Sequence, residues 1–202
     1  MKRTMRVCRK TPREFREMPW KNGLGVTREM YIFPQSALLE RNDFLWRLSS
    51  AVVSAGGPFS AFPGYDRILF LLSGEGMDLQ VNGEELILAD PLSSISFRGE
   101  DTVFCSLRGD TVTDFNIFFR RDCLSCSCRR ITPHTGKDLS LPAGDWNIIL
   151  CLRGKTVLEW PDREEELDGL EFLLFEESPP DFQFFCRSED NAELIGITLK
   201  RK

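Results

Sequence analysis

Short stretches of alternating apolar and polar residues recur along the chain, separated by turns that contain glycine or proline. Side chains alternate between the two faces of a β-strand, so this pattern predicts many short strands. Helical periodicity is weak, and residues 35–43 favour no more than a helical turn or two. We expect strands at residues 5–10, 26–33, 44–53, 68–72, 77–81, 85–88, 94–97, 103–107, 113–119, 146–153, 182–187 and 193–200.

Two of these strands combine apolar residues with polar ones on a single face. In the third predicted strand, alternation puts Arg47 and Ser49 on the face opposite Trp46. In the ninth, Asp114 and Asn116 share a face. An arginine in mid-strand indicates that this face lines something polar.

The second predicted strand, residues 26–33, is assigned in the same way. Strict alternation groups Arg28 with Ile32 on one face and Glu29 with Phe33 on the other.

Residues 68–97 and 148–175 form an internal repeat, in which four strands are separated by a glycine turn, a polar turn and a third turn. With a two-residue gap, the matched positions are Gly74 with Gly154, the turn at 82–83 with that at 161–162, Asp90 with Asp168, and Phe97 with Phe175. We therefore expect an all-β protein with two related halves, 1–121 and 122–202, packed as one unit. Each half would be a jelly roll, or double-stranded β-helix, and the pair an RmlC-like bicupin.

Charge and hydropathy narrow the class of protein. The net charge is -5 and the pI about 5.1, which argues against nucleic-acid binding, because that usually requires a basic face. No apolar run approaches the roughly 20 residues of a membrane span. The N-terminus carries charges without the apolar segment of a secretory signal, so a cytoplasmic location is expected.

Metal chemistry is not expected. Cupin barrels usually hold a metal on several histidines, but this chain has one histidine, His134, in the predicted linker. Cys123, Cys126 and Cys128 form a CxxCxC cluster, yet no second cysteine pair completes four zinc ligands. A reduced loop is the favoured interpretation of the cluster, a metal or redox site the alternative, and no cofactor is expected.

A loop before the second strand carries an unusual sequence, PWKNGLGVTRE over residues 19–29. Further motifs follow it in order: WRLS at 46–49, GPFS at 57–60, FPG at 62–64, DR at 66–67, DFN at 114–116 and RR at 120–121. In these motifs the chain resembles the HutD/Ves family of bacterial bicupin proteins. It departs from the family at Leu24, where a glycine is expected.

The resemblance and the strand faces together suggest a pocket for a small carboxylic acid in the first half. Arginine binds a carboxylate through a planar fork, aspartates orient arginines, and aromatic rings supply apolar walls. The candidate ligand-binding residues are Trp20, Lys21, Asn22, Arg28, Trp46, Arg47, Ser49, Phe59, Asp66, Arg67, Asp114 and Asn116.

Structural roles compete with this interpretation at several positions. Asp66 and Arg67 could form a local ion pair, and Trp46 could belong to the core. Asp114 and Asn116 could satisfy buried backbone groups, and the segment with Lys21 could be a simple turn.

The resemblance implies a binding protein that regulates histidine utilisation by holding an intermediate such as urocanate or formylglutamate. Two alternatives stay open. One is a metal-independent cupin enzyme acting on a small acid, and the other is a stress-response protein of the Ves type with a structural or interaction role. The expected partner is the carboxylate ligand, and a homodimer is left open.

Overall fold

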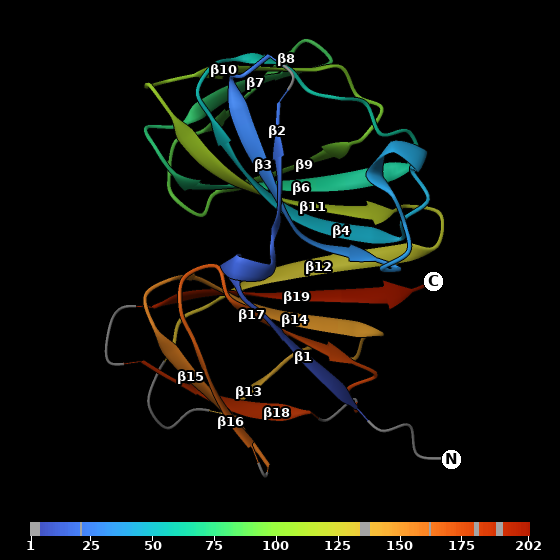
Figure 1. The fold of residues 1–202 in the computed structure, drawn as a ribbon, viewed down its shortest axis with the longest axis vertical. Helices are drawn as coiled ribbons and strands as arrows, with labels where there is room; N and C mark the ends of the chain where they lie inside the picture. Colours follow the sequence, from blue (N-terminus) through green and yellow to red (C-terminus); the bar gives the residue numbers. More distant parts are fainter. Residues whose placement is uncertain (1–4, 21, 134–137, 162, 180–181, 189–191) are drawn as a thin grey trace. The chain divides into compact units, whose positions relative to one another are not determined.

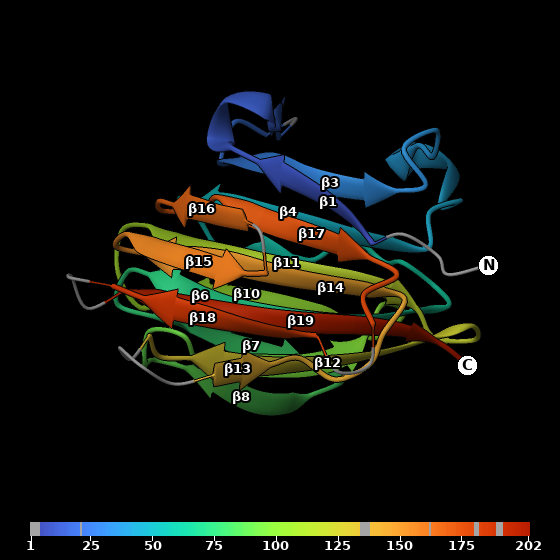
Figure 2. The same cartoon turned by 90° about the horizontal axis from the view of Figure 1, so that it is seen from below.

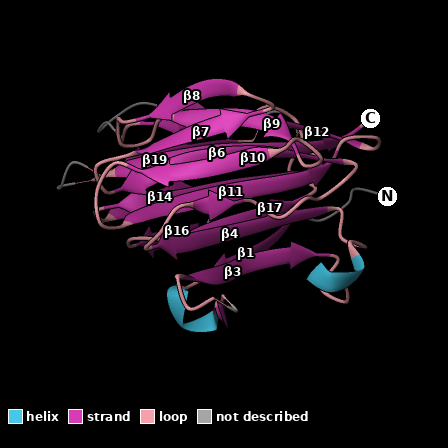
Figure 3. Ribbon diagram, turned by 90° about the horizontal axis from the view of Figure 1, so that it is seen from above, coloured by secondary structure: helices cyan, strands magenta, loops and turns pink. Residues whose placement is uncertain are grey.

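The structure is a computed structural model that describes all residues except 1–4, 21, 134–137, 162, 180–181 and 189–191. Its described residues form strands throughout, with two short 3₁₀ helices, η1 (Pro12–Glu14) and η2 (Leu39–Arg41) (Figure 3). The helical turn expected within residues 35–43 is thus η2 alone. No helix among the described residues has the length and apolar composition needed to cross a membrane.

The chain divides into two compact units. The first unit is Phe15–Cys123, and the second unit combines Met1–Glu14 with Leu124–Lys202. The sequence suggested halves of 1–121 and 122–202, with the opening strand in the first. That strand, β1 (Arg6–Lys10), instead pairs antiparallel with β17 of the second unit and lies beside it (Figures 1 and 2).

The first unit contains a six-stranded sheet with the order β2-β3-β4-β11-β6-β9 and a four-stranded sheet with the order β5-β10-β7-β8 (Figure 1). The strands of the six-stranded sheet are β2 (Arg16–Pro19), β3 (Gly25–Phe33), β4 (Trp46–Val53), β6 (Tyr65–Ser73), β9 (Ser94–Arg98) and β11 (Val112–Arg120). The strands of the four-stranded sheet are β5 (Gly57–Pro58), β7 (Met77–Val81), β8 (Glu84–Leu88) and β10 (Val103–Leu107).

The second unit has the same plan. Its sheets have the orders β1-β17-β14-β19-β12 and β13-β18-β15-β16. The strands of its first sheet, besides β1, are β12 (Leu124–Ile131), β14 (Trp146–Arg153), β17 (Phe172–Glu176) and β19 (Glu193–Arg201). Those of its other sheet are β13 (Asp138–Ser140), β15 (Thr156–Trp160), β16 (Arg163–Leu167) and β18 (Gln183–Arg187).

The internal repeat in the sequence corresponds to structurally equivalent strands in the two units. The order β9-β6-β11-β4 in the first unit matches β17-β14-β19-β12 in the second, and the smaller sheets match strand for strand. Leu92 and Leu170, which the repeat aligns, both have positive φ, at 66° and 65°. The backbone N–H of Leu92 donates to Leu71 O, and that of Leu170 donates to Cys151 O, both at 2.7 Å. Two jelly rolls in tandem are confirmed.

In each unit the core lies between the two sheets. In the first, Leu69 and Leu71 of β6 pack with Met77 and Leu79 of β7 and with Cys105 of β10. In the second, an equivalent cluster joins the two sheets and is formed by Ile149, Cys151, Leu158, Leu173, Phe175, Phe184, Cys186 and Leu194, among others. Apolar burial of this extent is the main stabilising contribution to such sandwiches.

The cysteine cluster was expected to form a loop, but only Cys123 lies in a turn, because residues 124–131 form strand β12, which contains Cys126 and Cys128. Cys126 and Cys128 project from the same side of this strand, with their sulfur atoms 4.0 Å apart. All seven cysteines are free thiols.

Candidate functional site

Polar side chains converge on the inner face of the larger sheet of the first unit. Adjacent strands align Arg47 of β4, Phe118 of β11 and Arg67 of β6 in one row. The next row across β4 and β11 pairs Ser49 with Asn116. Period-two alternation brings these residues to one face, as the sequence predicts, and all of them are buried.

Arg47 forms a buried ion pair with Glu29 of β3. Its Nε lies 2.7 Å from Glu29 Oε2, and its Nη1 donates to Ser49 Oγ at 3.0 Å. The Arg47 side chain is 3% exposed and that of Glu29 is 10% exposed. Glu29 was not among the predicted site residues, although register pairs it directly with Ser49. Its inward position could have been found from its alternation with Thr27.

Strand β3 also corrects an assignment made from alternation. Its register shifts by one residue between Glu29 and Tyr31, so Ile32 pairs with Arg47. Ile32 therefore packs with Phe118 in an inner cluster and does not share a face with Arg28. A β-bulge reverses the side-chain alternation beyond it.

Arg67 begins a second chain of contacts. Its Nη2 donates to Asn116 Oδ1 at 3.0 Å, and Asn116 Nδ2 donates to Asp114 Oδ1 at 3.0 Å. The same Asp114 oxygen accepts the backbone N–H of Ala51 at 3.2 Å. Asp114 thus reaches Arg67 through an intervening amide.

Aromatic rings enclose the Arg67 guanidinium. Its central carbon lies 5.0, 4.8 and 4.5 Å from the ring centroids of Phe59, Phe97 and Phe118. The guanidinium carbon of Arg47 lies 5.7 Å from the same Phe118 centroid, so both cations lie near one ring. Such contacts each contribute about 0.5–2 kcal/mol and partly offset the cost of burial.

Two donors in this network lack partners. Arg47 Nη2 and Arg67 Nε are buried and make no hydrogen bond to any part of the chain that the structure describes. A buried unpaired donor on a cation costs free energy, so both atoms favour an acceptor that arrives from outside the chain.

Burial also shifts the proton affinities of these groups. It lowers the pKa of Arg67 to about 10, an effect opposed by the charge of Asp114 and reinforced by that of Arg47. It lowers the pKa of Arg47, with Glu29 acting in the opposite direction. It raises the pKa of Asp114 to about 6, although Asn116 and Arg67 favour the ionised form.

This elevated pKa predicts a pH dependence of stability. The usual pKa of Asp114 is 3.8, so between about pH 4 and pH 6 the folded chain holds a proton that the unfolded chain has lost. The stability due to this group is therefore greatest below about pH 4 and falls as pH rises to about 6. We expect the free energy of unfolding of the wild type, minus that of Asp114→Asn, to drop by about 2 kcal/mol between pH 4 and pH 7. Urea titrations at both pH values measure it, and a difference that rises with pH would contradict the assignment.

The remaining predicted site residues divide into two groups. Phe59 and Trp20 pack against the inner cluster of the first unit. Trp46 lies on the opposite face of β4 from Arg47, where it stacks on Tyr31 at 5.0 Å between centroids.

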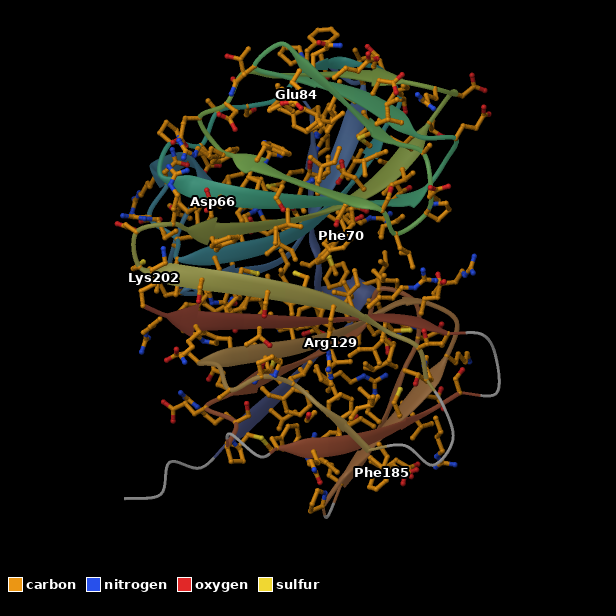
Figure 4. All side chains as sticks on the ribbon, turned by 180° about the vertical axis from the view of Figure 1, so that it is seen from behind. Asp66, Phe70, Glu84, Arg129, Phe185 and Lys202 are labelled. Carbon is orange, nitrogen blue, oxygen red and sulfur yellow. The ribbon has the colours of Figure 1, made fainter. Side chains whose placement is uncertain are left out.

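Three polar candidates do not join the network. Arg28 is exposed and bonds Glu17 at 2.9 Å, and Asp66, near the start of β6, bonds Arg121 at 2.9 Å (Figure 4). Asn22 is exposed, and its side chain accepts the N–H of Leu24. Lys21 and His134 lie outside the described residues.

The loop that begins the PWKNGLGVTRE motif joins β2 to β3 as a hairpin. Trp20 donates its backbone N–H to Gly25 O at 2.9 Å and its indole N–H to Thr27 Oγ1 at 2.8 Å. A Cβ atom at Gly25 would lie 2.9 Å from the Trp20 ring and 2.8 Å from Val52 O. The glycine therefore allows Trp20 to pack close to the sheet.

Comparison with known proteins identifies the family. A family model described as HutD matches residues 12–194. The chain belongs to the HutD family. It is 40% identical over 106 residues to an uncharacterized 21.2 kDa protein in the hutC 3′ region of Pseudomonas putida, covering 52% of this chain and 54% of that one. It is 36% identical over 127 residues to protein Ves of Escherichia fergusonii, covering 60% and 63%. The aligned part thus spans less than two thirds of either relative, and the resemblance to the HutD/Ves family is confirmed.

Solved structures agree with the fold. A conserved protein of unknown function from Pseudomonas aeruginosa PAO1 superposes with a TM-score of 0.84 and 25% identity, over 96% of this chain and 99% of that one. A cupin 2 conserved barrel domain protein from Leptotrichia buccalis superposes with a TM-score of 0.57 and 9% identity, over 87% and 89%, which shows the cupin fold alone.

The interior of this HutD-family unit does not suit the metal that cupins commonly hold. Its two carboxylates, Glu29 and Asp114, are balanced by Arg47 and Arg67, so no surplus negative charge is available to a cation. Within the described residues no group of three or more histidine, cysteine or acidic side chains is arranged to hold a metal ion. An anionic ligand fits the N–H donors of these arginines better than a metal ion does.

The second unit of the HutD-family chain provides an internal comparison. Through the equivalence of Leu71 with Cys151, the strand registers match Arg67 with Asn147 and Asp114 with Leu194. By the same registers, Asn116 corresponds to Gly196 and Arg47 to Ser127. The same architecture therefore forms without these charges, so the fold itself does not require them.

A separate shallow hollow of about 630 Å³ lies on the first unit. Its lining includes Ser54–Gly56 and residues 104–107, and its one charged lining residue is Asp110. A hollow whose only charge is negative does not favour an acid, so we assign the site to the arginine network.

Proposed function

We propose that this HutD-family protein binds a small carboxylic acid in the interior of its first unit. One observation carries the proposal: Arg47 Nη2 and Arg67 Nε are buried beside the same Phe118 ring without partners among the described residues. A carboxylate has two acceptor oxygens and binds guanidinium N–H groups with strong, charge-assisted hydrogen bonds. The rings of Phe59, Phe97 and Phe118 would contact its apolar part.

The biological setting that we propose is histidine utilisation. The family carries the name HutD, and one relative is named for its place in the hutC 3′ region. Urocanate and formylglutamate, both carboxylates, are the intermediates we favour, and binding would report their level to the pathway.

Titration calorimetry with urocanate and N-formylglutamate tests the proposal. We expect saturable binding of at least one acid, weakened about 100-fold in Arg67→Met because charged hydrogen bonds contribute about 1.5–3 kcal/mol. Arg28→Met is the matched control, since Arg28 is exposed and lies outside the network, and it should bind as the wild type does. Circular dichroism verifies that each variant is folded.

Two results would count against the proposal. Equal affinity in the wild type and Arg67→Met would remove Arg67 from the site, and no binding of either acid would reject the ligand class. Mass spectrometry of the recovered ligand separates binding from catalysis, because an enzyme would return a new chemical species.

A further inference from the structure

The charges inside the first unit are balanced before any ligand binds. Arg47 and Arg67 are the buried cations, and Glu29 and Asp114 are their anionic partners. A ligand carboxylate bound to the two free guanidinium donors would add a third negative charge. In a medium of low polarity this surplus is costly, and gaining one proton removes it.

The geometry shows which carboxylate would take that proton. Glu29 contacts Arg47 directly at 2.7 Å and keeps 10% of its side chain exposed, so both a cation and water stabilise its charge. Asp114 is 3% exposed, and its Oδ1 accepts only neutral donors, Ala51 N and Asn116 Nδ2, among the described hydrogen bonds. Its charge is the less supported of the two.

The other groups around Asp114 do not compete for the proton. Arg47 on β4 and Arg67 on β6 stay cationic, and Glu29 on β3 is held by Arg47. From the facing sheet, Cys105 on β10 feels the charge of Asp114, and burial raises the pKa of its thiol to about 11. The pKa of Asp114 is already raised to about 6, so a modest further increase on ligand binding would leave it protonated at neutral pH.

We propose that the first unit binds its carboxylate together with one proton, which is taken from water and ends on Asp114. The ligand enters as the anion, and one Asp114 oxygen gains an O–H bond. Arg67 and Asp114 then form a linked pair in which the arginine holds the ligand and the aspartate adjusts the charge. This inference rests on the proposed function and names Asp114 as the residue that sets the net charge the site accepts.

Proton uptake is measurable. We titrate urocanate, whose single carboxylate adds one negative charge, into the full chain at pH 7.5 in phosphate and in Tris, buffers that differ in ionisation enthalpy. The difference in heat should correspond to about one proton gained per ligand bound. The dissociation constant should be about 10-fold weaker at pH 8 than at pH 7.

Two variants assign the proton. Asp114→Asn should lose both the uptake and the pH slope, whereas Asp66→Asn, which changes a carboxylate that bonds Arg121 outside the network, should keep them. Retention of the uptake and the slope in Asp114→Asn would overturn the assignment. If Asp114→Asn does not fold, the wild-type heats decide. Binding without proton uptake overturns this inference and leaves the proposed function standing, whereas no binding at all defeats both.

Discussion

Replacing Glu29 with glutamine should lower the free energy of unfolding by about 3–5 kcal/mol. The change removes the anion that lies 2.7 Å from Arg47 Nε and leaves a guanidinium that is 3% exposed without its counter-charge. Breaking a buried ion pair from one side costs this much because the remaining charge is neither solvated nor paired. Urea denaturation followed by circular dichroism measures the loss.

A double-mutant cycle separates the pair from its surroundings. Arg47→Met should also destabilise, but the double variant Glu29→Gln with Arg47→Met should recover most of the loss, since no lone charge remains. The exposed pair of Arg28 and Glu17, 45% and 59% exposed, is the matched control, and breaking it should cost no more than about 1 kcal/mol. Additive losses in the cycle would contradict a direct ion pair. A folded double variant that no longer binds acid would show that binding requires Arg47, whereas folding does not.

Replacing Gly99 with alanine should destabilise the first unit by about 3 kcal/mol or more. A Cβ atom there would lie 2.1 Å from Phe62 O, which is a backbone atom and cannot rotate away. Gly99 also donates to Tyr65 O and accepts from Phe62 N, both at 2.7 Å, so the 62–65 segment would have to move away from the turn that follows β9.

This displacement should also reach the candidate site. The Phe62 ring lies 5.0 Å from that of Phe118, which both buried arginines contact. We therefore expect weaker acid binding together with the lower melting temperature. Gly57→Ala is the control, because nothing lies within 4 Å of its added Cβ and its φ is not positive. A Gly99→Ala variant as stable as Gly57→Ala would contradict the close approach.

Alternation was sufficient where strands run without interruption. Arg47, Ser49, Asp114 and Asn116 lie on the inner face because β4 and β11 keep a regular register through them. The same rule excludes Asp66, which adjoins Arg67 on β6 and so projects to the other face. Asp66 was suggested as a site residue by its place in the DR motif, and it forms an ion pair with Arg121 instead.

The features that sequence patterns missed depend on non-local contacts. The bulge in β3 leaves no mark in the order of apolar and polar residues, so alternation wrongly grouped Ile32 with Arg28 on one face. Strand β12 is rich in serine and cysteine and resembles a loop until its pairing with β19 is seen. Glu29 was overlooked because its role depends on a cation 18 residues away in sequence.

The pairing of β1 with β17 bears on how the chain is made. Arg9 bonds Glu171, which is 162 residues farther along, so strand β1 leaves the ribosome well before its partner is synthesised. Residues 15–123 can fold in the interval, since that unit is continuous in sequence. Strand β1 must meanwhile stay unpaired, and its charged residues Arg6, Arg9 and Lys10 would keep this waiting edge from joining other chains. The second unit can then be completed only when β1 pairs with β17 across this long separation, which is a slow kind of contact to form.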